Sequence, residues 1–332
     1  MSACPDTWSF GLKSQLNLGY SGCYVECVIA DIPSERSAVT RVLVLGGSGM
    51  LGHKLCQVFG PIFDTYASFR APPPNIPGVF DRVHPLVGIT ADDFESVASA
   101  IIETTPNYVI NAIGIVKQRE EAKQAIPSIT LNALFPQQVA AVCRDRSIKF
   151  VQVSTDCVFS GLRGNYTEGD IPDPTDLYGR SKLLGEVDDG SALTLRTSII
   201  GQELGDGLGL VEWFLGQAGG HVRGYANAIF SGLTTTALSR IIARTIEGGR
   251  LHGIWHVSSE AITKYDLLLR LNEAFQNGAT VDRDEQFRCD RSLVSERFWR
   301  ETGLSRPTWP EMISELAADA TPYPRRGARA VH

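Results

Sequence analysis

The 332-residue sequence lacks several features that would assign it to a special class. No apolar stretch approaches the roughly 20 residues that a membrane span needs, which argues against an integral membrane protein. The N-terminus has no basic segment followed by an apolar core, as secretory signals have, so we expect a cytoplasmic protein. No run of Lys and Arg occurs, and the formal net charge of -6 argues against a nucleic-acid-binding role.

Cysteine is present without the spacing of a disulfide framework or a zinc site. The seven cysteines are odd in number, no C-x-x-C pair occurs, and most of them lie inside apolar segments. This pattern is typical of reduced, buried thiols in a cytosolic protein. The histidines have no metal-ligand spacing either, so the sequence predicts no metal site.

What is present is an ordinary globular composition, with 43% hydrophobic and 20% charged residues. Residues 1–40 show no sustained periodicity, and we treat them as an N-terminal extension. From Arg41 onward, short apolar segments alternate with segments of helical spacing. This alternation predicts a doubly wound parallel sheet with helices on both faces. The expected strands are 42–45, 65–69, 108–111, 150–153 and 193–196, and the expected helices are 50–59, 92–104, 129–144 and 178–186.

After residue 198 the alternation loosens. The pattern there predicts helices over 210–217, 235–247 and 264–275 and a late strand near 254–258. We therefore expect a dinucleotide-binding domain over 41–198, joined by the late strand, and a mainly substrate-binding lobe over 199–322. Residues 323–332 would form a tail. Such a lobe would lie over the carboxyl ends of the strands, where doubly wound sheets bind ligands.

A glycine-rich turn follows the first predicted strand and opens the first predicted helix. Its glycines have the G-x-x-G-x-x-G spacing, which permits a tight turn, lets the backbone approach a pyrophosphate and allows close helix–strand packing. The helix N-terminus adds unpaired N–H groups and a partial positive charge. The turn therefore predicts a dinucleotide site formed by Gly46, Ser48, Gly49, Met50, Leu51 and Gly52.

Two further segments bear on the cofactor. Arg70 ends the second predicted strand, where an acidic residue would bind the 2′-hydroxyl of NAD and an arginine suits the 2′-phosphate of NADP. We expect NADPH, with NADH as the alternative and a solvated surface arginine as the other interpretation of Arg70. Ala112, Ile113 and Gly114 follow the strand at 108–111 and offer small residues where a nicotinamide would lie.

Tyr178 and Lys182 lie four residues apart in a predicted helix, and therefore on one face of it. A phenol with its ordinary pKa of about 10 is a poor acid at neutral pH. A neighbouring ammonium is expected to lower that pKa and to make proton transfer to a developing alkoxide practicable. Thr155 directly follows the strand at 150–153 and can hydrogen-bond a substrate carbonyl. The Tyr–Lys pair alone is also typical of an ordinary amphipathic helix. It indicates catalysis because it occurs together with Thr155 at the end of a predicted strand.

Four segments resemble, in order and spacing, the extended short-chain dehydrogenase/reductases; they are 46–52, 111–114, 154–161 and 178–182. Within that family, the run 154–161 is most similar to the dTDP-4-dehydrorhamnose reductase branch. The resemblance covers roughly residues 41–320. It implies Thr155, Tyr178 and Lys182 as the catalytic triad, with Tyr178 protonating the C4 oxygen and Lys182 holding the cofactor ribose.

Other positions are interpreted through the same resemblance. Asn132 matches a position where the family often keeps asparagine for support, although a plain polar helix residue is an equal interpretation. Cys157 stands where most of the branch has an aromatic residue, and it would border the substrate. The related dehydratases need a glutamate base at this place, so the sequence argues against dehydration.

The substrate residues are sought in the second lobe. Trp213 and Phe214 are expected to stack on sugar or base, with a place in the core as the alternative. Arg223 or Arg288 is expected to pair with a diphosphate.

The resemblance implies reduction of the C4 ketone of a nucleotide-linked 6-deoxy-4-ketohexose. The first expectation is dTDP-4-dehydrorhamnose to dTDP-L-rhamnose, in the supply of cell-surface polysaccharide precursors. UDP- or GDP-linked 4-keto sugars, 4-epimerisation of a nucleotide sugar and a non-catalytic subunit resembling the regulatory subunit of methionine adenosyltransferase remain open. The family is often dimeric, so a homodimer is also open.

Overall fold

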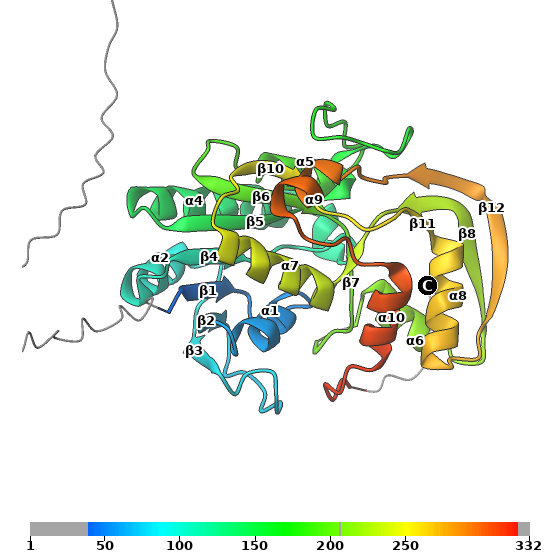
Figure 1. The fold of residues 1–332 in the computed structure, drawn as a ribbon, viewed down its shortest axis with the longest axis horizontal. Helices are drawn as coiled ribbons and strands as arrows, with labels where there is room; N and C mark the ends of the chain where they lie inside the picture. The colour runs from blue at the N-terminus through cyan, green and yellow to red at the C-terminus, as the bar shows by residue number, and fades with distance from the viewer. Residues whose placement is uncertain (1–38, 206, 325–332) are drawn as a thin grey trace, which may run out of the picture. The chain divides into compact units, whose positions relative to one another are not determined.

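A seven-stranded parallel sheet forms the centre of the protein (Figure 1). The computed structural model describes residues 39–205 and 207–324, so the predicted extension over 1–40 lies almost wholly outside the described residues. The strand order is β10-β6-β5-β4-β1-β2-β3, and it reverses direction between β1 and β4. The predicted doubly wound fold is confirmed. The strands are β1 (Arg41–Leu45), β2 (Asp64–Phe69), β3 (Val83–Val87), β4 (Tyr108–Asn111), β5 (Lys149–Thr155), β6 (Ala192–Thr197) and β10 (Gly253–His256).

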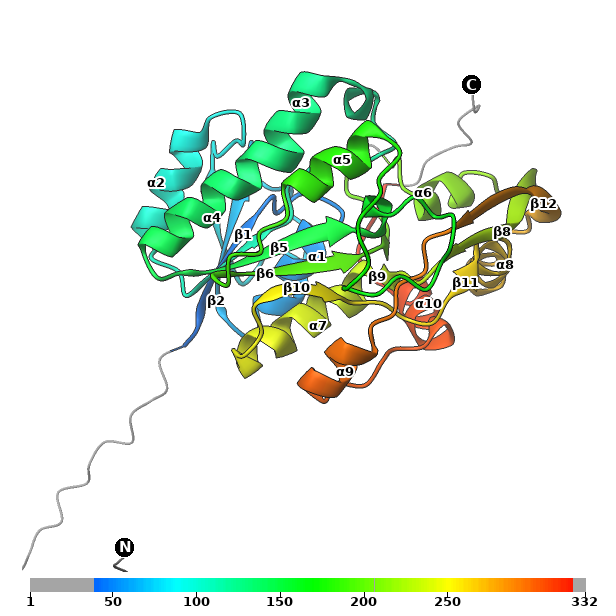
Figure 2. The same ribbon diagram turned by 90° about the horizontal axis from the view of Figure 1, so that it is seen from above.

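Helices cover both faces of this sheet (Figure 2). On one face lie α1 (Gly52–Phe59) and α7 (Thr235–Gly248); on the other lie α2 (Phe94–Thr104), α4 (Phe135–Asp145) and α5 (Leu177–Leu184). Strand β1 contributes to two cores, because alternate strand residues face opposite sides of a sheet. Val42 and Val44 belong to one buried cluster, and Leu43 and Leu45 belong to the other. Burial on both faces explains why residues 42–45 of this strand are all apolar.

The single helix predicted over 129–144 is wrong in detail. The chain forms α3 (Ala125–Ile129), then a wide π turn over Thr130–Leu134, and then α4. Pro136, in the first turn of α4, has no N–H to donate to the carbonyl of Asn132 four residues earlier, and this favours the wider turn. The wide turn places Asn132 beside the functional site described below.

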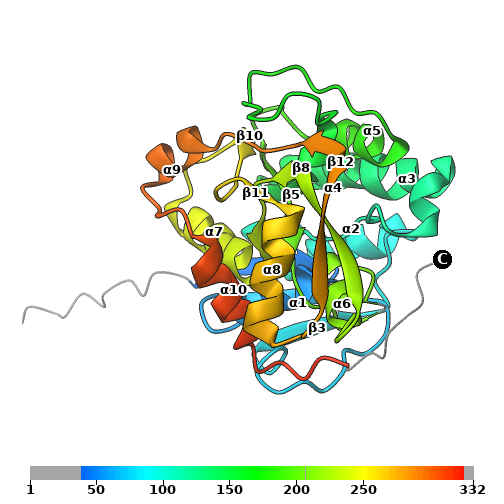
Figure 3. The same cartoon turned by 90° about the vertical axis from the view of Figure 1, so that its right-hand side faces the viewer.

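A smaller lobe is built around a three-stranded sheet in the order β11-β8-β12 (Figure 3). Its long strands β8 (His221–Phe230) and β12 (Thr280–Asp290) pair in parallel, and α8 (Lys264–Phe275) lies against β8. The sequence pattern predicted neither β8 nor β12. Strand β12 has no apolar alternation to detect, because it is a largely exposed edge rich in charged residues. The remaining elements are β7 (Ile199–Ile200), β9 (Leu233–Thr234), β11 (Ile262–Thr263), α6 (Leu210–Leu215), α9 (Glu296–Thr302), α10 (Trp309–Ala317) and the 3-10 turns η1 (Glu120–Lys123) and η3 (Asp156–Val158).

The chain returns to the first helix after α10. Lys54, buried in α1, pairs with Asp319, and the hydroxyl of Tyr323 lies 3.0 Å from Nε2 of His53. The part of the predicted tail that the structure describes, residues 323 and 324, thus begins with a side chain packed on the main sheet domain. In residues 39–205 and 207–324, no helix has both the length and the apolar character required to cross a membrane.

Candidate active site

A cavity of about 690 Å³ lies at the carboxyl ends of β1, β4 and β5, where the strand order reverses, and residues of the smaller lobe close its other side. This is the place at which open parallel sheets bind ligands, and the volume is in the range of small-molecule sites. Most of the residues singled out from the sequence line it. They are Ser48, Gly49, Met50, Leu51, Arg70, Ala112, Ile113, Gly114, Thr155, Cys157, Tyr178 and Lys182.

The glycine-rich turn forms one end of the cavity. A Cβ on Gly52 would lie 1.9 Å from the carbonyl oxygen of Gly46, so only glycine lets α1 begin this close to the turn. The turn is tied to β2, since Gly47 N–H donates to the Ser68 carbonyl at 2.9 Å. No acidic side chain stands in the first turn of α1, so the N–H groups and the partial positive charge there favour an anion. Exposed Arg70, directly after β2, lines the same cavity.

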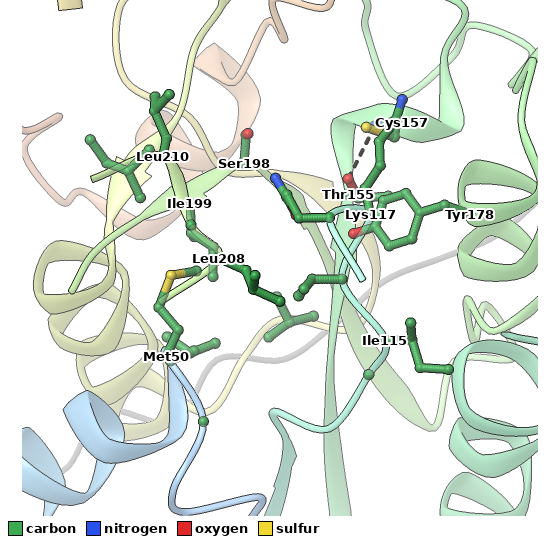
Figure 4. A pocket seen from close by; sticks show the side chains of 18 of the residues that line it. Met50, Ile115, Lys117, Thr155, Cys157, Tyr178, Ser198, Ile199, Leu208 and Leu210 are labelled. Atoms are coloured by element: carbon green, nitrogen blue, oxygen red, sulfur yellow. Dashed lines mark hydrogen bonds between the residues drawn. The ribbon is translucent and has the colours of Figure 1, made fainter. Parts of the chain in front are cut away.

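Thr155 and Tyr178 meet at another part of the cavity wall (Figure 4). Thr155 is the last residue of β5, and its hydroxyl accepts a hydrogen bond from Cys157 N–H at 3.1 Å. Tyr178 stands in the first turn of α5, which Asp176 caps by accepting from Gly179 N–H at 2.8 Å. A Cβ on Gly179 would lie 2.2 Å from the carbonyl oxygen of Cys157, so the helix touches the loop after β5 through its backbone. This contact brings the phenol to the threonine.

The pKa of Tyr178 moves in the opposite direction to the one expected from the sequence. Burial raises it, and the neighbouring Cys157 and Asp156 act in the same direction; only the hydrogen bond with Thr155 opposes them. Lys182 does not offset these effects, and its Nζ donates to the Val153 carbonyl at 2.7 Å. In this state the phenol is firmly protonated at neutral pH.

Lys182 is nearly fully buried, and burial lowers its pKa to about 8 even though Glu186 acts to raise it. An ammonium has three donors, and the Val153 carbonyl uses one of them. A Cβ on Gly114 would lie 3.9 Å from Nζ, so the ammonium stands next to the backbone that follows β4. The remaining donors are therefore placed to hold a ligand hydroxyl against this segment.

Asn132 connects the segment after β4 to helix α5. Its side chain accepts from Ile115 N–H at 2.9 Å and donates to the Ile115 carbonyl at 3.2 Å and to Ser181 Oγ at 3.3 Å. Asn132 is buried and bridges the Ile115 backbone and the Ser181 side chain, so its role in the structure is support.

A buried ion pair beneath the site was not anticipated from the sequence. Arg196 binds Glu186 through two hydrogen bonds of 2.8 and 2.7 Å, and Ser154 Oγ donates to the same carboxylate at 2.6 Å. The available signal was the position of Glu186, four residues after Lys182. Because β6 must bring Arg196 beside it, the sequence spacing alone could not show the pair.

The residues of the second lobe that were expected at the substrate lie outside the cavity lining. Trp213 packs against the main core beside fully buried Phe214, the alternative that the sequence left open. Arg223 is exposed on β8 and lies 3.6 Å from Asp284. The lobe instead contributes Lys264, Phe287, Cys289 and Arg291 to the lining, together with Lys117 of the main domain, which pairs with Asp176 at 2.6 Å.

Comparisons with known proteins agree with this geometry. A probable low-salt glycan biosynthesis reductase of Haloferax volcanii is 31% identical over 258 residues, which are 72% of this chain and 86% of the relative. The methionine adenosyltransferase 2 subunit beta of Xenopus laevis is 25% identical over 80% of both chains. A crystal structure of dTDP-4-dehydrorhamnose reductase from Bacillus anthracis, in complex with NADP, has a TM-score of 0.67 at 22% identity and shares the fold over 84% of this chain and 98% of its own.

The family described as RmlD substrate binding domain matches residues 40–321, nearly all of the described chain. The match spans both the glycine-rich turn and the lobe with β8 and β12. The protein therefore belongs to the RmlD substrate-binding-domain family and has the extended short-chain dehydrogenase/reductase fold.

Proposed function

We propose that the protein is an NADPH-dependent reductase of the C4 ketone of a nucleotide-linked 6-deoxy-4-ketohexose. The observation that carries this proposal is the meeting of Thr155, Tyr178 and Lys182 in one cavity with a glycine-rich helix N-terminus. The first substrate to test is dTDP-4-dehydrorhamnose, with dTDP-L-rhamnose as product. The protein would act in the cytoplasm on precursors of cell-surface polysaccharide.

The residues present fit a nicotinamide dinucleotide. The turn offers backbone N–H groups to the pyrophosphate, Lys182 keeps ammonium donors for a ribose hydroxyl, and Arg70 is placed for a 2′-phosphate. NADPH would supply the hydride that reaches C4. NADH remains the alternative, because exposed Arg70 is the single observation that favours the phosphate.

The chain's own residues then account for the proton. The hydroxyl of Thr155 hydrogen-bonds the C4 oxygen and stabilises the charge that develops on it. The phenol of Tyr178 donates its proton to that oxygen, so that a hydride and a proton are added across the C=O bond. An alkoxide is a far stronger base than a phenolate, so the transfer is downhill even though burial raises the pKa of Tyr178.

The test is NADPH oxidation with a panel of 4-keto-6-deoxy sugars carried on dTDP, UDP and GDP. Oxidation with one carrier supports the reductase and identifies the nucleotide. If NADPH binds and no sugar is reduced, the proposal fails. The measurement then turns to the second candidate, a non-catalytic regulatory subunit, which the similarity to the methionine adenosyltransferase subunit favours.

A further inference from the structure

Two cations in the cavity have no role in the mechanism above. Lys264 is the first residue of α8, and Arg291 directly follows β12. Both line the cavity with Thr155, Asp156 and Cys157. They come from parts of the lobe that are far apart in sequence, and they meet at its contact with the catalytic loop.

The ammonium of Lys264 is half-buried and available. Its Nζ lies 3.6 Å from the centre of the Phe230 ring, itself part of the cavity wall. In residues 39–205 and 207–324 it has no hydrogen-bond or ion-pair partner. Burial lowers the pKa of Lys264 to about 8, so it is still largely charged at pH 7. A half-buried cation of this kind favours an anionic ligand, which would restore the interactions lost from water.

Arg291 is held in a fixed orientation. Its Nε donates to the Phe159 carbonyl at 2.8 Å and its Nη2 donates to the Ser160 carbonyl at 3.2 Å. These bonds use two of the five donors of a guanidinium. The side chain is therefore anchored to the loop after the catalytic strand, and donors remain for a ligand in the cavity.

The charges around these two groups do not balance. Asp156 is the carboxylate that acts electrostatically on both Lys264 and Arg291. It is buried, and its Oδ1 accepts a hydrogen bond from the Thr155 hydroxyl at 3.2 Å. The nearby Cys157 thiol does not supply the missing charge, because burial raises its pKa to about 12. Asp176 also acts on Arg291, but it pairs with Lys117 at 2.6 Å, so the three cations Lys117, Lys264 and Arg291 face two carboxylates. Burial raises the pKa of Asp156.

The strand geometry explains why Arg291 reaches the cavity and the arginines predicted from the sequence, Arg223 and Arg288, do not. Phe287 and Cys289 in β12 and Arg291 directly after it are spaced by two, and all three line the cavity. Alternate residues of a strand share a face. Arg288 falls on the other parity and is exposed, and Arg223 is exposed on β8.

We propose that Lys264 and Arg291 form an oxyanion-binding subsite for the substrate, separate from the glycine-rich turn that would bind the cofactor. The inference rests on the proposed function, because it assumes that the substrate occupies this end of the cavity. Two groups of a nucleotide sugar have the required chemistry, namely the diphosphate and a carboxylate on the sugar. Either would satisfy the donors left free by Lys264 and Arg291.

The experiment is calorimetric titration of NADP⁺-loaded protein with dTDP, UDP, GDP and the matching nucleosides. Lys264→Met is the main variant, because a substitution of Arg291 would also remove its hydrogen bonds to the Phe159 and Ser160 carbonyls. We expect Lys264→Met to weaken binding of the preferred diphosphate about tenfold and to leave nucleoside binding unchanged. Lys264→Arg should restore most of the affinity. Arg300→Gln is the control for charge, since Arg300 is exposed on α9 away from the cavity lining.

A second pair of ligands, UDP-glucuronate and UDP-glucose, separates the two sources of negative charge. If Lys264→Met weakens UDP, the subsite holds the diphosphate. If it spares UDP and removes only a preference for UDP-glucuronate, the subsite holds a sugar carboxylate. Unchanged binding of every probe in Lys264→Met, or no binding by the unaltered protein, overturns the inference. These titrations measure binding and need no turnover. A failure of this inference is therefore distinguishable from a failure of the proposed reductase activity.

Discussion

The two ends of the cavity are built in different ways. The end with the glycine-rich turn is made from one continuous segment, and it presents mainly backbone N–H groups. The opposite end is assembled from the end of β5, the start of α8 and the residue after β12, and it presents charged side chains. A backbone site can be recognised from local spacing, whereas a site of converging side chains appears only once the chain is folded. If the division is functional, substitutions at each end should affect different ligands.

The largest expected effect is from Tyr178→Phe, which removes the proposed proton donor from the wall between the two ends. Turnover should fall by about 10² to 10⁴-fold, the usual contribution of a positioned acid. NADPH affinity should stay nearly the same, because the phenol acts on the substrate. Single-turnover rates and a fluorescence titration with NADPH measure the two quantities, and Tyr66→Phe, outside the cavity lining, is the control. Turnover at the unaltered rate would rule out the mechanism.

A smaller effect is expected from pH, and it distinguishes the two lysines. The pKa of Lys182 is lowered to about 8, so its ammonium is lost in the free protein as the pH rises through that value. If the charged form binds the ribose, NADPH affinity should fall about tenfold between pH 7 and pH 9.

The two lysine variants provide the comparison for this pH profile. Lys182→Met should bind NADPH weakly at every pH and lose the dependence. Lys264→Met should keep the dependence, although the pKa of Lys264 is also lowered to about 8. A flat profile in the unaltered protein would show that the ammonium of Lys182 does not contribute to cofactor binding.

The smallest effect is expected at the exposed edge of the cofactor end. Arg70→Gln should raise the KM for NADPH about fivefold, since an exposed ion pair contributes up to about 1 kcal/mol. The KM for NADH should not change, because NADH lacks the 2′-phosphate. Steady-state kinetics with both cofactors test this prediction. Equal changes for the two cofactors would remove Arg70 from phosphate recognition.

The sequence was informative where chemistry is local. The spacing of Gly46 to Gly52 and the interval from Tyr178 to Lys182 each lie within one strand–helix or helix segment, so their geometry follows from the chain itself. The alternation of strands and helices similarly predicted the parallel sheet. In contrast, Arg196 beneath the site and Arg291 above it depend on which strands become neighbours, and no short-range pattern reports that.

Protonation was the other property that the sequence could not give. The spacing of Tyr178 and Lys182 suggested that the ammonium would act on the phenol, whereas the folded chain turns the ammonium to the Val153 carbonyl and buries the phenol near Asp156. Likewise, the edge strand β12 has no apolar alternation, because most of its side chains face solvent. In both cases the surroundings, and not the residue types, decide the outcome.

The contact between Gly179 and the Cys157 carbonyl limits how this site can change. Because main chain meets main chain there, the spacing of Tyr178 and Thr155 is preorganised before any ligand arrives, and less conformational entropy has to be lost on binding. A side chain at position 179 would push the helix away from the loop. Replacement of other side chains that line the cavity can then change the substrate preference, while the spacing of Tyr178 and Thr155 is kept.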